Sequence, residues 1–201
     1  MLVLKDLAVD ISLVDAVKSR IMKKLPALKH LDNDLLEDPK DIEAYIEKIS
    51  PHCPLRISED SPIMVLVTKG PGSGVYHKFC QLVKNVDPST DEKLKKNLND
   101  ELRALDAFLH SDQMPGKFLG GEKLILPDCI LLPKLLHIKV VAKVFKDFEI
   151  SEDYKNIHDY MKNANEEQAF TRTSPSEEVI VDAWARAMKV LNPLQRKGRK
   201  H

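Results

Sequence analysis

Three cysteines and one histidine–cysteine pair are the residues whose types could support thiol or metal chemistry. Cys53, Cys80 and Cys129 form no C-x-x-C pair and no even-numbered framework, so neither a redox dithiol nor a set of disulfides is indicated. His77 and Cys80 lie one helical turn apart, as metal ligands can, but no second pair follows at a fitting spacing. We therefore predict free thiols, no bound metal and a reducing, cytoplasmic compartment.

Asp128 and Pro133 are predicted to have structural roles in a helix from Ile125 to Phe148. Asp128 stands at the third helical position, where its carboxylate can accept the backbone N–H of Ile125, which is one half of a capping box. Pro133 has no N–H for the carbonyl of Cys129, which predicts a bend in the helix.

The apolar residues of this stretch surround the helix instead of forming one stripe, so we expect other helices to cover it. Cys129 and His137 are interpreted as core residues, because no histidine nearby would activate the thiol. Charged residues interrupt the apolar run from Leu124 to Phe145, and it falls short of the ~20 largely uncharged residues that a membrane-spanning helix needs.

The first fifty residues alternate strand-like and helical patterns. We expect a strand at Ala8–Ile11, a helix from Ser12 to about Lys24, and a β-hairpin formed by Ala27–Leu31 and Leu35–Glu37. Asp38 followed by Pro39 then begins another helix. Its apolar face carries Ile42, Tyr45, Ile46 and Ile49.

From Ser73 onward the pattern is helical throughout. Two amphipathic helices meet at a turn near Asp87 and are expected to pack antiparallel. After the buried helix, further helices begin at Ser151 and at Ser174, and Trp184 has the spacing of a core residue. The segment Pro51–Gly74 contains four prolines and three glycines, so 51–72 is predicted to be a connection without a regular element. The predicted organisation is thus 1–50, a linker at 51–72, an all-helical domain at 73–192 and a basic tail at 193–201.

The overall charge excludes a general attraction to polyanions. Lys plus Arg and Asp plus Glu are both 31 in 201 residues, so we expect no nucleic-acid partner. The tail Arg196-Lys-Gly-Arg-Lys-His201 is the local exception to this charge balance. It is either a solvated end, which we favour, or a segment that contacts anionic lipid or nucleic acid.

Several segments resemble the intracellular chloride channel (CLIC) family, which has the glutathione-transferase fold. The resemblance rests on Lys117-Phe-Leu-Gly-Gly-Glu-Lys-Leu124, Pro127-Asp-Cys-Ile-Leu-Leu-Pro-Lys-Leu135, Ile138-Lys-Val-Val-Ala-Lys143 and Phe170-Thr-Arg-Thr-Ser-Pro175. It implies an α/β plus all-α fold, in which a partial thioredoxin-like N-terminal domain precedes an all-helical C-terminal domain.

The resemblance also implies a function and a ligand subsite. It implies a cytoplasmic protein that associates with membranes and supports chloride conductance. If so, vesicle binding and anion flux are expected to rise with acid or oxidant. Four residues match positions where relatives bind glutathione, namely Leu25, Pro26, Glu37 and Asp38. The structural alternative is that Glu37 and Asp38 form a helix cap and that Pro26 is a proline at the start of a strand.

The start of the chain departs from the family pattern. Met1-Leu-Val-Leu-Lys5 resembles the end of the family's first helix, so the cysteine-bearing turn before that helix is missing, and a fragment or an internal start is the explanation we favour. We therefore predict no catalytic residues, no required cofactor and no enzyme. The alternatives are a non-catalytic scaffold that binds protein partners, and a glutathione-dependent thiol transferase whose cysteine motif lies upstream.

Overall fold

The computed structural model describes residues 27–30, 35–111, 114, 116–190 and 194. The chain divides into two compact units, Met1–Arg56 and Ile57–His201. The strand expected at Ala8–Ile11, the helix expected from Ser12, and the tail at 195–201 lie outside the described residues, as do Leu25 and Pro26.

In the first unit, an antiparallel bridge precedes helix α1 (Pro39–Ile49). Leu28 and Leu36 exchange backbone hydrogen bonds of 2.8 and 2.9 Å, which is the pairing that the predicted hairpin requires. Asp38 caps α1 as predicted, since its Oδ1 accepts the N–H of Lys40 at 2.8 Å. On the apolar face of α1, Ile46 is buried and the other members are half-buried.

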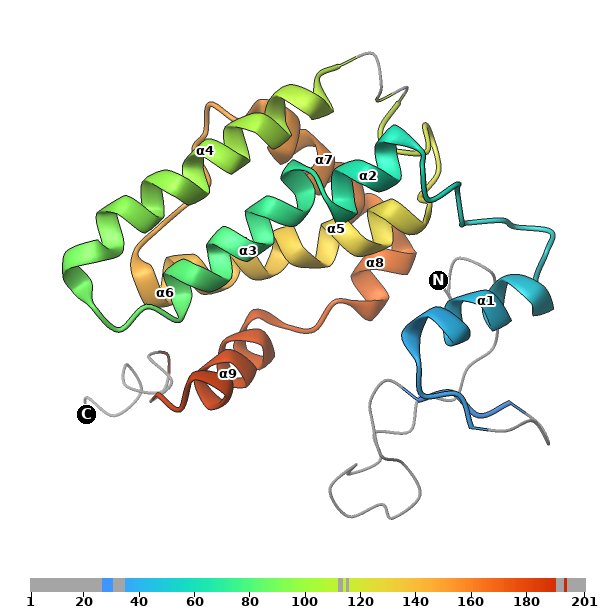
Figure 1. Ribbon diagram of the computed structural model, residues 1–201, viewed down its shortest axis with the longest axis horizontal. Coiled ribbons are helices and arrows are strands. Elements are labelled where there is room, and N and C mark those ends of the chain that lie inside the picture. Colours follow the sequence, from blue (N-terminus) through green and yellow to red (C-terminus); the bar gives the residue numbers. More distant parts are fainter. Residues whose placement is uncertain (1–26, 31–34, 112–113, 115, 191–193, 195–201) are drawn as a thin grey trace. The chain divides into compact units, whose positions relative to one another are not determined.

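Helices make up most of the second unit's described residues (Figure 1), and an isolated antiparallel bridge joins Phe118 and Gly121 in the loop before α5 (Leu126–His137). Its elements are α2 (Pro62–Thr68), α3 (Pro71–Val83), η2 (Pro88–Thr90), α4 (Asp91–Leu109), α5 (Leu126–His137), η3 (Ile138–Ala142), α6 (Lys143–Lys146), α7 (Lys155–Glu166), α8 (Gln168–Thr173) and α9 (Glu177–Met188).

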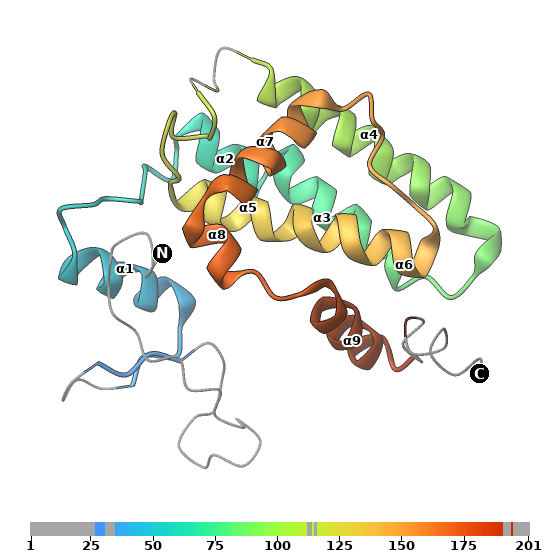
Figure 2. The ribbon, with the colours of Figure 1, turned by 180° about the vertical axis from the view of Figure 1, so that it is seen from behind.

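The run α5–η3–α6 forms the axis of this unit (Figures 1 and 2). Helices α2, α3 and α7 pack against α5, and α3 and α9 pack against η3. Leu131, Leu135 and Val141 on the axis are fully buried. The prediction that other helices cover this segment is confirmed, and so is the packing of α3 on α4.

The single helix predicted from Ile125 to Phe148 is interrupted. The α-helix continues through Pro133, and the wider π-helical turn η3 follows at Ile138–Ala142. Asp147 then ends α6 in the left-handed conformation, with φ of 48°. The departure from regular α-helix therefore lies beyond Pro133, where the sequence has no proline or glycine.

Other predicted boundaries also need correction. The stretch 51–72 contains α2, because Pro62 stands at a helix start instead of breaking a helix. Pro71 likewise begins α3, two residues before the predicted Ser73. Ser176, and not Ser174, caps α9 by accepting the N–H of Val179, and α7 begins at Lys155.

Among the described residues, every helix is too short or too polar to cross a bilayer.

Candidate functional site

Asp128 is the buried centre of the contacts around the start of α5. Its Oδ2 accepts the backbone N–H of Ile125 at 2.8 Å, which is the bond that the half capping box predicts. Its Oδ1 accepts the backbone N–H of Leu119 at 3.0 Å and the hydroxyl of Tyr160 at 2.7 Å. One carboxylate thus joins the loop before α5, the helix start and α7.

The surroundings of Asp128 affect the ionisation of its carboxyl in two opposite ways. Burial raises the pKa of its carboxyl, whereas hydrogen bonds from Ile125, Tyr160, Leu119 and Gly120 act in the opposite direction. Burial, with the charge of Asp128 beside it, raises the pKa of Tyr160 well above the usual range. Because both carboxylate oxygens are occupied by donors, Asp128 is poorly placed to exchange protons with a substrate.

A second group of residues gathers on α3, α5 and α9. We call Tyr76, Cys80, Lys134, His137 and Trp184 the aromatic cluster. Lys134 Nζ lies 5.8 Å from the centre of the Tyr76 ring. Trp184 Nε1 donates to His137 Nδ1 at 3.4 Å, with the two rings nearly perpendicular. This hydrogen bond joins two residues, His137 and Trp184, that lie 47 positions apart in the sequence.

Burial changes the ionisation of four members of the aromatic cluster. It raises the pKa of Tyr76 and of Cys80 and lowers the pKa of Lys134 and of His137. Perturbed groups often mark functional sites. Here burial favours the neutral form of each group, so Cys80 is kept as a thiol, and a thiol is a weaker nucleophile than a thiolate.

The remaining cysteine predictions concern Cys53 and Cys129. Both are half-buried and form no disulfide. Burial raises the pKa of the Cys129 thiol, which does not favour a nucleophilic role. Within the described part of the chain, no cluster of three or more His, Cys, Asp or Glu side chains could hold a metal ion.

The predicted glutathione residues are only partly within the described chain. Leu25 and Pro26 lie outside it. Asp38 Oδ1 already accepts a backbone N–H as the cap of α1. The helix-cap alternative therefore explains the role of this oxygen without a bound glutathione. Glu37 is half-buried beside it. The glutathione subsite stays a prediction.

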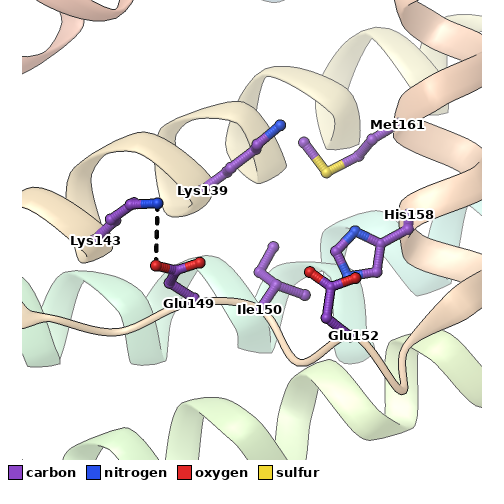
Figure 3. Close-up of a pocket in the computed structure, with 7 residues that line it drawn as sticks. All are labelled: Lys139, Lys143, Glu149, Ile150, Glu152, His158 and Met161. Atoms are coloured by element: carbon purple, nitrogen blue, oxygen red, sulfur yellow. Dashed lines mark ion pairs between the residues drawn. The ribbon is translucent and has the colours of Figure 1, made fainter.

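A polar pocket of about 180 Å³ lies beside η3, α6 and α7 (Figure 3). Ile150 and Met161 supply its apolar side chains, and His158 Nε2 lies 3.0 Å from the carbonyl oxygen of Ser151. Lys143 Nζ pairs with Glu149 at 3.0 Å across its edge, with both side chains more than half exposed. Charges of both signs line the pocket, so it does not favour one class of ion.

Three solved structures are similar to this chain, and one of them is a glutathione transferase. Dehydroascorbate reductase from Chlamydomonas reinhardtii is 24% identical with a TM-score of 0.67, over 81% of this chain and 72% of that one. The CLIC homologue EXC-4 from C. elegans is 18% identical with a TM-score of 0.69, over 84% and 62%. Rice GST1 (OsGSTU1), solved with glutathione, is 15% identical with a TM-score of 0.54, over 78% and 72%.

A family match identifies the helical unit. Residues 63–168, more than half of the chain, match the family described as "Glutathione S-transferase, C-terminal domain". The chain belongs to this family.

The prediction that the protein is not an enzyme is corrected by these comparisons. Two of the three similar structures are of enzymes, a dehydroascorbate reductase and a glutathione transferase. The prediction rested on one missing cysteine motif. Since the fold is shared with enzymes, it does not exclude catalysis.

Sequence analysis missed the partner of Asp128 and the contact between His137 and Trp184. Tyr160 lies 32 residues after Asp128, and no local spacing connects them. His137 and Trp184 were both interpreted as core, although both are only half-buried. A histidine and a tryptophan on otherwise apolar helix faces were the available signal, because each polar ring atom needs a partner when it is buried.

Proposed function

We propose that this chain is a CLIC-type protein, cytoplasmic and able to associate with membranes and support chloride conductance. The observation that carries the proposal is the resemblance of the segments Lys117–Leu124 and Pro127–Leu135 to that family. These two segments form the loop and the helix that Asp128 joins. The similarity to the CLIC homologue EXC-4 supports the same assignment.

The basic tail offers a physical basis for membrane contact. Arg196, Lys197, Arg199 and Lys200 lie within six residues without an acidic neighbour. Each basic residue near an anionic leaflet contributes about 1 kcal/mol of attraction, which falls within a Debye length. Four such charges would concentrate the protein at an anionic surface at low salt.

Vesicle flotation tests the membrane part of the proposal. The full chain is mixed with vesicles containing about one third phosphatidylserine, at pH 7.4 and pH 5.5 and at low and high salt. We expect co-flotation that increases at the lower pH, and weaker binding when the four basic residues of the tail are changed to Gln. Neutral phosphatidylcholine vesicles are the control. Failure to float under every condition would exclude membrane association.

A second candidate function is glutathione-dependent reduction, which the similarity to dehydroascorbate reductase favours. Such chemistry needs a reactive thiolate. Burial raises the pKa of Cys80 and of Cys129, so among the three cysteines Cys53 is the one to test. Reduction of dehydroascorbate by glutathione that is lost in Cys53→Ser, and retained in Cys80→Ser, would establish this function. Activity no higher than the uncatalysed rate would reject it.

A further inference from the structure

The pocket beside η3, α6 and α7 has one wall formed by the chain that connects α6 to α7. Hydrogen bonds hold this connection at both ends. The backbone N–H of Phe148 donates to the carbonyl of Ala142 at 3.2 Å, and the backbone N–H of Tyr154 donates to the carbonyl of Ser151 at 3.0 Å. His158 Nε2 lies 3.0 Å from the same Ser151 oxygen, and it must be the donor because a carbonyl only accepts. The wall is therefore positioned before any ligand enters, which lowers the cost of binding.

Two lysines and two glutamates line this pocket, and only two of the four are paired. Lys143 and Glu149 neutralise each other at 3.0 Å. In the part of the chain that the structure describes, no ion pair or side-chain hydrogen bond engages Lys139 or Glu152. In the view of Figure 3, Lys139 ends beside Met161, whereas the carboxylate of Glu152 lies below it, next to His158. One positive and one negative group without partners therefore line the same pocket.

The floor of the pocket is apolar and its volume suits a small molecule. Ile150 and Met161 are buried, with 7% and 8% of their surface exposed, and both line the pocket. The pocket volume is about 180 Å³, and an apolar cavity of about 150 Å³ in another protein holds benzene. A ligand of about six to ten non-hydrogen atoms therefore fits, with its apolar part on the floor and its charged groups at the rim.

We propose that this pocket binds a small zwitterion, namely an α-amino acid with an aliphatic side chain such as leucine. The ligand carboxylate pairs with Lys139, its ammonium pairs with Glu152, and its aliphatic chain covers Ile150 and Met161. A ligand with one charge leaves one of the two protein charges without a partner, and this difference is the basis of selectivity. Binding requires neither a thiolate nor a membrane, so the inference does not depend on the proposed function.

Methyl NMR of the full chain tests the binding. The sequence has six methionines, and the methyl signal of Met161 is assigned by its loss in Met161→Leu. We expect this signal to shift saturably as L-leucine is added, with a dissociation constant on the order of 1 mM, because both ion pairs form at exposed side chains.

Three analogues of leucine test which of its groups are recognised. Isocaproate lacks the ammonium group, isoamylamine lacks the carboxylate, and glycine lacks the aliphatic chain. Each should bind at least about threefold more weakly than leucine, since each loses one of the three contacts. No saturable shift with leucine up to about 20 mM would overturn the proposal. Binding of isocaproate or isoamylamine as tight as that of leucine would overturn it too.

Variants locate the two charged contacts. Lys139→Gln and Glu152→Gln each remove one exposed charge, so both should fold, and each should weaken leucine binding at least about threefold. Lys139→Gln should also bind isoamylamine as well as leucine, because it has no partner for the carboxylate. Glu166→Gln, at the exposed end of α7, is the matched control and should bind like the wild type. Unchanged leucine affinity in Lys139→Gln and in Glu152→Gln would overturn the assignment of the site.

Discussion

Asp128 shows how a single buried carboxylate can join three segments of a fold. It is fully buried, and the donors on its two oxygens come from the loop before α5, from the start of α5 and from α7. Burying a charge is costly unless hydrogen bonds compensate for it. The three bonds supply that compensation and hold three segments together.

We predict that Asp128→Ala strongly destabilises the protein. The change leaves the N–H groups of Leu119 and Ile125 and the hydroxyl of Tyr160 without their acceptor, and each buried unsatisfied group costs roughly 1–3 kcal/mol. Urea denaturation should show the free energy of unfolding fall by about 3 kcal/mol or more. Asp159→Asn, at an exposed position of α7, should change it by less than about 0.5 kcal/mol. A loss below about 1 kcal/mol for Asp128→Ala would contradict the role assigned to this residue.

The ion pair between Lys146 and Asp91 makes the stability of the protein depend on pH. Lys146 Nζ lies 2.9 and 3.0 Å from the two carboxylate oxygens of Asp91, and both side chains are largely buried. Hydrogen bonds from Asn85 and then from Lys146 lower the pKa of Asp91. A lowered pKa in the folded state gives stability that is present above the ordinary value and is lost as the pH falls through the folded value.

Lys146→Met should therefore reduce the free energy of unfolding by about 1–2 kcal/mol near pH 7. The difference from the wild type should shrink as the pH falls below about 3.9. Lys143→Met removes an exposed pair with Glu149 and should cost at most about 0.5 kcal/mol. Urea denaturation at several pH values measures both. A Lys146→Met deficit of the same size at acid and neutral pH would show that charge is not its cause.

At the scale of the element, α5 contains a proline whose cost the surrounding helices must offset. Pro133 is exposed and lies inside α5, where it cannot donate to the carbonyl of Cys129. An interior proline costs a helix roughly 3 kcal/mol. A proline also restricts the unfolded chain, which returns up to about 1 kcal/mol.

Pro133→Ala should therefore raise the free energy of unfolding by about 2 kcal/mol, with a higher melting temperature in calorimetry. Pro88→Ala is the matched control, since Pro88 is exposed and stands at the first position of η2, where a missing N–H costs little. Equal or lower stability of Pro133→Ala would mean that the packing around α5 requires the conformation that the proline imposes.

The elements that sequence analysis found are those with long apolar periodicity. Helices α3, α4 and α5 have it, and the cap at Asp38 marked α1. Helix α2 was missed because Pro62 was interpreted as a breaker although it stands at a helix start. Helix α8 has six residues, which is too short to show a period. The π-helical turn η3 has an apolar sequence that would suit an α-helix equally well.

The contacts of the candidate site could be predicted from the sequence only where the two partners lie close together in the chain. The bond from Ile125 to Asp128 spans three residues and follows from the capping-box spacing. The bonds from Tyr160 to Asp128 and from Trp184 to His137 span 32 and 47 residues. Such pairs depend on how helices pack, which the pattern of one sequence does not specify.

At the scale of the whole molecule, the helical unit defines the family and the function is a separate question. The same fold occurs in a reductase, a glutathione transferase and a CLIC homologue. What separates these activities is the chemistry of particular residues. The two candidate functions differ in their requirements, because reduction needs a thiolate and conductance needs a membrane.

Chloride release from vesicles tests whether the protein supports chloride conductance. Vesicles of about one third phosphatidylserine are loaded with chloride, and efflux is recorded with a chloride electrode after the full chain is added at pH 7.4 and pH 5.5. We expect efflux that depends on protein concentration, increases at pH 5.5 and occurs without release of an entrapped large dye. Efflux no greater than that of protein-free vesicles at both pH values, with or without oxidant, would contradict it.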